Sequence, residues 1–150
     1  MSNTLVQPTL QRLSALRNKL LHLHRVLLEI ERNAYEQVRG RVSSGELLQL
    51  VIHHDQFAWL HRLSELVVQI DEILQADEPI SPDDVQSLIV DARTLLTPQQ
   101  VGNAFNRKYY NALQREPAAV LAHAEVTKLL EKNARQFPVR VRSIRFPMGE

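Results

Sequence analysis

The chain has 150 residues, the length of one ordinary domain, and no cysteine, which excludes disulfides, thiol catalysis and thiolate metal ligands and favours a reducing, cytoplasmic location. Its net charge of +1 is well below the basic excess of most nucleic-acid-binding proteins. It also lacks a cleavable N-terminal apolar segment and any run of about 18 uncharged apolar residues, so we expect a soluble, unprocessed protein that does not enter a membrane.

The first predicted helix covers residues 8–38. Pro8 suits the first helical position because its φ is fixed, and Gly40 favours termination of the helix. Apolar residues recur along it at the helical period and therefore share one face. They are Leu10, Leu13, Leu16, Leu20, Leu23, Leu27, Leu28, Ala34, Tyr35 and Val38.

Three polar residues interrupt this apolar face. Arg17, His24 and Glu31 are seven residues apart, or about 10 Å along a helix. Because inward polar groups cost free energy unless they are paired, these residues either form structural hydrogen bonds, face solvent or a dimer partner, or line a polar pocket. For the last case, the candidate ligand-binding residues are these three together with His54 and His123.

Residues 46–75 are predicted to form the central helix, around which the fold is organised. Ser43 and Glu46 have the spacing of a capping box at its start. The apolar phase changes at residues 53–56, where Asp55 could act as a new N-cap, so a kink or short break is expected there. The middle of the core should contain Trp59, Leu63, Leu66 and Ile70.

The same region carries a resemblance. The run His54-Asp55-Gln56-Phe57-Ala58-Trp59-Leu60, with Leu63-Ser64-Glu65-Leu66, Ile70-Asp71-Glu72, Tyr35-Glu36 and Ala122-His123-Ala124, resembles a stretch of small uncharacterised bacterial proteins that are helical throughout. The resemblance covers most of the chain and implies an all-helical fold. It implies no activity and assigns no functional residue.

Three further helices follow. A hydroxyl cap, a proline and two acids at residues 81–84 predict the start of the third helix, which ends near Leu96. Thr97 and the proline after it repeat this signal and predict the start of a fourth helix. Pro117 then marks the start of a fifth, unless the fourth and fifth form one kinked helix.

The predicted fold is all-α, an antiparallel bundle of four to five helices that forms a single domain over residues 1–136. Residues 137–150 form an extended basic tail, because apolar and basic residues alternate there with period two. We expect the tail to lie along the bundle, pair with a second copy or stay free. Its candidate interaction residues are Val139, Arg140, Val141, Arg142, Ile144 and Arg145.

No sequence motif indicates catalysis or a cofactor. Di-iron carboxylate bundles need Glu-x-x-His pairs, and the chain has none. Glycine-rich phosphate loops and nucleophile elbows are absent too. His61 and Glu65 have a spacing that metal sites use, but they lie opposite the apolar face of their helix. We therefore predict no catalytic residue, no metal site and no cofactor.

Three functions remain. The first is a non-catalytic helical bundle that binds another protein or a second copy of itself. Binding of a second copy would make the protein a homo-oligomer, which is the expected state. The second is a bundle that binds a small ligand or metal through the inward polar residues. The third is nucleic-acid binding through the arginine-rich tail, which the near-neutral total charge disfavours.

Overall fold

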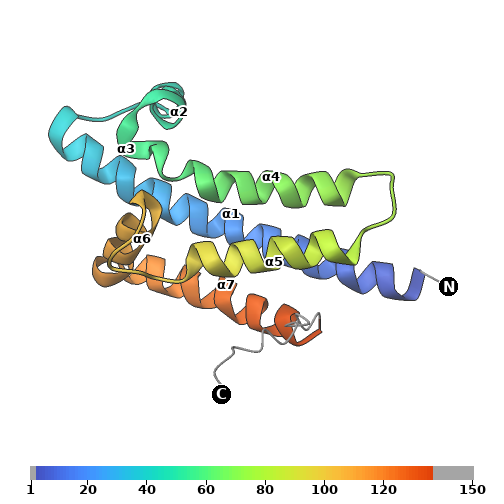
Figure 1. Ribbon diagram of the computed structural model, residues 1–150. Helices are drawn as coiled ribbons and strands as arrows, with labels where there is room; N and C mark the ends of the chain where they lie inside the picture. Colours follow the sequence, from blue (N-terminus) through green and yellow to red (C-terminus); the bar gives the residue numbers. More distant parts are fainter. Residues whose placement is uncertain (1–2, 137–150) are drawn as a thin grey trace, which may run out of the picture.

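The computed structural model describes the backbone of residues 3–136 and the side chains of residues 9–132. This part of the chain is helical and contains no strand (Figure 1). Its helices are α1 (Asn3–Arg39), α2 (Ser44–His53), α3 (Asp55–Ala58), α4 (His61–Gln75), α5 (Pro82–Leu96), α6 (Ala104–Arg115) and α7 (Pro117–Gln136). The seven helices of this part exceed the predicted four to five, because the predicted central helix is divided into α2, α3 and α4.

Four long helices surround the core. Helix α1 packs against α4 and α7, and α5 packs against the same two helices (Figure 1). Each contributes apolar residues at the helical period, which is why each buries one face. Trp59 is also buried, as predicted, and its ring centroid lies 5.3 Å from that of Phe105 on α6. From α1 and α4 the buried residues are Leu13, Leu16, Leu20, Leu23, Leu27, Leu63, Leu66, Val67 and Ile70.

Local signals placed several helix starts correctly. The capping box of α2 is present, since the Glu46 amide donates to Ser43 Oγ and the Ser43 amide donates to the Glu46 carboxylate. The Ser81 side chain accepts from the Asp84 amide at the start of α5. Helix α7 begins at Pro117.

Two predicted helix starts were wrong. Helix α1 begins at Asn3, so Pro8 lies within its first two turns, where its missing amide removes one intrahelical hydrogen bond. Thr97 does not open α6, because it caps the end of α5 and its hydroxyl donates to the Arg93 carbonyl at 2.6 Å. The N-cap of α6 is instead Asn103.

The break predicted at residues 53–56 is present, but Asp55 is not its cap. His54 has an extended backbone and ends α2, and its Nδ1 accepts from the Gln56 amide at 3.1 Å to begin α3. An imidazole nitrogen thus takes the capping role expected of a carboxylate. A turn at residues 59–60 then leads into α4.

None of the helices in residues 3–136 combines the length and the apolar character that crossing a bilayer requires. The predicted tail, with Val139, Arg140, Val141, Arg142, Ile144 and Arg145, lies outside the described residues.

Candidate functional site

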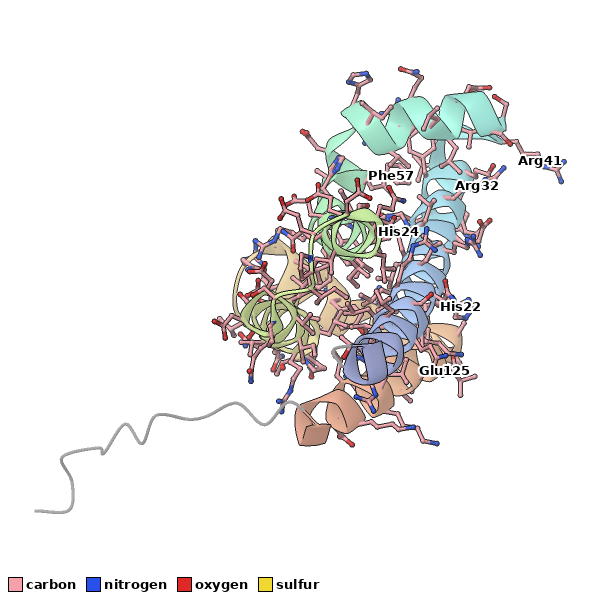
Figure 2. The ribbon with its side chains drawn as sticks, turned by 90° about the vertical axis from the view of Figure 1, so that its right-hand side faces the viewer. His22, His24, Arg32, Arg41, Phe57 and Glu125 are labelled. Carbon is pink, nitrogen blue, oxygen red and sulfur yellow. The ribbon has the colours of Figure 1, made fainter. Side chains whose placement is uncertain are left out.

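The three inward polar residues of α1 each contact a polar partner on α3 or α4. We call these pairs the polar ladder, and they are Arg17 with Asp71, His24 with Ser64, and Glu31 with Gln56. The first is an ion pair between guanidinium and carboxylate. In the second, His24 Nε2 lies 3.0 Å from Ser64 Oγ, and in the third, Gln56 Nε2 donates to the Glu31 carboxylate at 2.9 Å. Figure 2 shows His24 on the side of α1 that faces α4, with His22 on the outer side.

The spacing of the polar ladder follows from the packing of α1 against α4. Residue numbers rise along α1 while those of the partners fall, so the two helices run in opposite directions along this contact. A step of seven residues is about two helical turns, which keeps each pair on the facing sides of the helices. Arg17, His24 and Glu31 can therefore face inward because each has a hydrogen-bond or ion-pair partner that offsets the cost of burying a polar group.

His24 is the partly buried imidazole of the ladder. Burial lowers its pKa, and the charge of His61 lowers it further. The Ser64 hydroxyl has one proton and lies 3.3 Å from the Leu60 carbonyl, to which it donates. A hydroxyl committed in this way accepts from His24, which favours the neutral tautomer with its proton on Nε2.

His54 lies at the α3 end of the polar ladder. Its ring centroid is 5.5 Å from that of Tyr35 on α1. Its Nδ1 accepts from the backbone amide of Gln56, whose side chain reaches Glu31. His54 therefore helps to position the residue that pairs with the last member of the ladder.

His123 belongs to a separate cluster between α6 and α7. Its Nδ1 lies 2.6 Å from the phenol oxygen of Tyr109, with which it forms a hydrogen bond. Burial lowers the pKa of His123 and raises the pKa of Tyr109. Four of the five candidate ligand-binding residues therefore lie along the ladder, whereas the hydrogen bond of His123 is made in this second cluster.

Among the described residues, no group of three or more histidine, aspartate or glutamate side chains could hold a metal ion. His61 and Glu65, which share a metal-like spacing, are both exposed.

A cleft of about 540 Å³ lies between α1 and α6 and was not predicted from the sequence. Trp59 lines it, and the indole N–H of this residue is buried with no acceptor among the described groups. Four residues of α6 line it too, and the only local sequence signal of the cleft was their spacing, which places them on one helix face. That this face lies opposite α1 depends on the tertiary structure. The polar lining residues include Glu31 and Gln37 of α1 and Lys108, Asn111 and Arg115 of α6.

A second feature is the exposed helix α2, at one end of the molecule (Figures 1 and 2). Five of its ten residues are leucine, valine or isoleucine, yet none of its residues is buried. Leu47, Leu50 and Val51 are partly covered by the body of the molecule, whereas Leu48 is 57% exposed and Ile52 is 50% exposed. Because folded proteins normally bury the large apolar side chains of a helix, this surface is a candidate for contact with another molecule.

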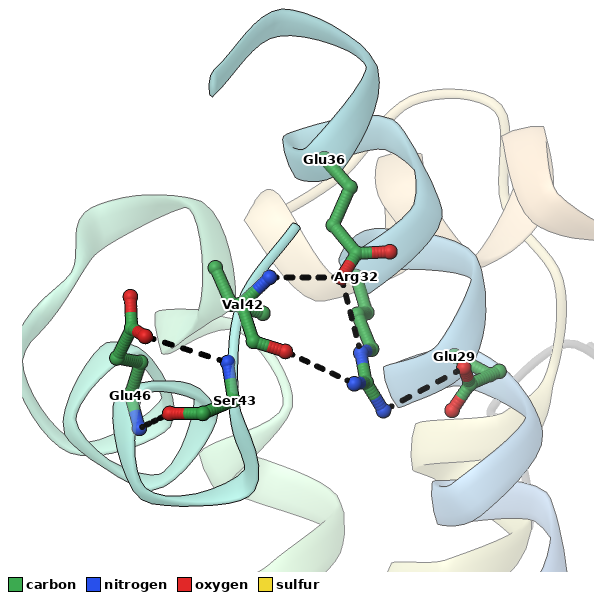
Figure 3. A network of polar contacts seen from close by, with 6 residues as sticks. All are labelled: Glu29, Arg32, Glu36, Val42, Ser43 and Glu46. Atoms are coloured by element: carbon green, nitrogen blue, oxygen red, sulfur yellow. Dashed lines mark hydrogen bonds and ion pairs between the residues drawn. The ribbon is translucent and has the colours of Figure 1, made fainter. Parts of the chain in front are cut away.

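Polar contacts hold the chain that leads into α2 (Figure 3). The Val42 amide donates to the Glu36 carboxylate at 2.9 Å, and Arg32 donates to the Val42 carbonyl at 3.0 Å. Arg32 also forms ion pairs with Glu36 and Glu29, at 3.5 and 3.8 Å. The Val42 amide, aided by the Arg32 charge, lowers the pKa of Glu36. We call this cluster the α2 anchor.

No protein-family model matches the chain, and no curated protein or solved structure shows significant similarity to it. The resemblance of residues 54–60 to small bacterial helical proteins therefore stays a prediction. The functional argument rests on the geometry of the polar ladder, the cleft and α2.

Proposed function

We propose that the chain is a non-catalytic protein-interaction module, an antiparallel helical bundle that associates with a second copy of itself through α2. The observation that carries this proposal is the exposure of the α2 apolar side chains, above all Leu48 and Ile52. Burying such side chains is the main favourable contribution to protein association, at roughly 25 cal/mol per Å².

The α2 anchor supports this role. A helix with no fully buried residue gains only modest stability from packing, so its position also depends on the chain that holds it. Arg32 and Glu36 fix the backbone of Val42, just before α2 begins. A pre-organised helix loses less conformational entropy on binding than one that must first become ordered.

The pattern of side chains on α2 favours a second copy as the partner. Gly45, Leu48 and Ile52 are three and four residues apart and therefore lie on one side of the helix. In an antiparallel pair of α2 helices, Ile52 of each copy can lie over Gly45 of the other. A side-chain atom placed at Gly45 would meet nothing within 4 Å, so this side is open to an approaching helix.

We expect the association to be weak. Stable complexes bury about 800 Å² on each partner, more than one face of a ten-residue helix offers. Sedimentation equilibrium over a wide concentration range should therefore show a monomer–dimer equilibrium for the full chain.

The control variant is Val101→Ser, which removes an apolar side chain that is 81% exposed and lies outside α2. The double variant Leu48→Ser, Ile52→Ser should be monomeric at concentrations where the parent and Val101→Ser dimerise. A parent that stays monomeric throughout, or a double variant that dimerises normally, would overturn self-association through α2.

The tail is a second candidate for association, because Val139 and Val141 alternate with Arg140 and Arg142. A chain that ends at Gln136 separates the two surfaces in the same sedimentation experiment. Dimerisation that survives this truncation and is lost in the α2 double variant supports α2. The reverse result assigns association to the tail.

A further inference from the structure

The cleft between α1 and α6 combines opposite charges. Lys108, Arg115, Glu31 and Glu116 all line it. Within the described part of the chain, these four side chains form no ion pair. The Glu31 side chain has one carboxylate oxygen engaged, by Gln56. Two cations and two carboxylates can therefore contact one ligand.

The spacing of the charges indicates the size of that ligand. Lys108 and Arg115 are seven residues apart on α6, which places them about 10 Å apart along the helix. Asn111 lies between them, and Gln37 lies on the α1 wall. The cleft volume of about 540 Å³ is typical of sites that hold an organic molecule with several functional groups.

Trp59 adds an apolar surface to the cleft. The residue is only 7% exposed, and its buried indole N–H has no acceptor among the described groups. Buried donors normally have a partner, and an unpaired one costs free energy. A ligand with two charged ends, an amide group and an apolar side chain would match the charges, the amide side chains and the tryptophan.

We propose that this cleft binds a short zwitterionic peptide. The peptide carboxylate contacts Lys108 or Arg115, and its ammonium group contacts Glu31 or Glu116. A polyanionic ligand fits less well because the two carboxylates would repel it, and a simple cation fits less well because of the two basic residues. This site is separate from the α2 surface and does not depend on self-association.

The test uses the leucine dipeptide with free ends as the probe. Trp59 is the only tryptophan of the chain, so its fluorescence reports directly on the cleft. We expect a saturable fluorescence change with the free dipeptide. The same dipeptide, acetylated at its N-terminus and amidated at its C-terminus, should bind at least about tenfold more weakly, because it has lost both charges. Titration calorimetry of the same solutions checks both affinities.

Variants identify the residue that holds the carboxylate. The variant that removes this residue, either Lys108→Gln or Arg115→Gln, should weaken binding several-fold, while Lys128→Gln, which makes the same charge change on α7 outside the cleft, should not. Circular dichroism verifies that each variant folds. Absence of binding, equal binding of free and blocked dipeptides, or an equal loss in Lys128→Gln would contradict the proposal.

Discussion

The middle of α1 and the connection from its C-terminal end to α2 differ in how they use apolar and polar residues. Where α1 packs against α4 and α7, its leucines are buried and its inward polar residues are paired in the polar ladder. Where α1 leads into α2, apolar side chains of α2 stay exposed and the α2 anchor holds the backbone. Burial therefore stabilises the body of the molecule, whereas local polar contacts help to determine where α2 lies.

Truncation of a core residue should have the largest effect. Leu63 is fully buried on α4, so Leu63→Ala should lower the free energy of unfolding by about 2–5 kcal/mol. Leu48→Ala on α2 makes the same chemical change at an exposed site and should cost no more than about 0.5 kcal/mol in the monomer. Urea unfolding followed by circular dichroism measures both. Equal losses would remove the distinction between the two regions.

The polar ladder should contribute less per pair than a core leucine. Ser64→Ala removes the hydroxyl that bonds His24 Nε2, and we expect it to cost about 1 kcal/mol because His24 is only partly buried. Ser14→Ala is the matched control, since Ser14 is also a half-buried serine on a long helix but lies outside the ladder. The same urea experiment compares them, and an identical loss in both would show that the ladder bond contributes nothing specific.

The sequence predicted those features that depend on neighbours along the chain. The caps at Ser43 and Ser81 and the inward face of α1 follow from local spacing, so they could be read directly. The start of α6 was missed because the Thr97 hydroxyl bonds the Arg93 carbonyl of the preceding helix, and local sequence does not show which competing bond forms.

The candidate site was predictable only in part. The inward position of His24 followed from the helical period, but its partner Ser64 lies 40 residues away. Only the register of α1 against α4 brings the two together. The cleft needs α6 beside α1 in the same way, so the spacing of Lys108 and Arg115 alone did not reveal it.

The pH dependence of stability should show a smaller difference between the polar ladder and α2 than the substitutions above. Because burial holds the pKa of His24 below its ordinary value of 6.5, the unfolded chain takes up a proton first as the pH falls. The contribution of His24 to stability is therefore complete above pH 6.5 and decreases below it, until the folded protein also takes up the proton.

His24→Gln should flatten part of this decrease, because His123, whose pKa is also lowered, accounts for another part. The control is His53→Gln, which makes the same substitution at an exposed residue of α2. Thermal melts between about pH 7.5 and about pH 5 compare the two variants with the parent. Parallel curves for all three proteins would contradict this role of His24.

The smallest effect on global stability should come from the α2 anchor, although its local effect should be large. Arg32→Met keeps the approximate length of the side chain but removes its contacts with Val42, Glu36 and Glu29. Partly exposed ion pairs each contribute no more than about 1 kcal/mol, so the urea midpoint should change little. Since α2 has no fully buried residue, loss of the anchor should instead speed hydrogen exchange in residues 42–53 while the amides of α4 keep their protection.

The control for this experiment is Arg25→Met, which lies on the same helix but outside the anchor. It removes an exposed arginine without touching the chain that precedes α2, so exchange in residues 42–53 should stay at the parent rate. Faster exchange in Arg32→Met alone would assign the position of α2 to the anchor. Unchanged exchange there would mean that the half-buried side chains Leu47, Leu50 and Val51 suffice to hold the helix.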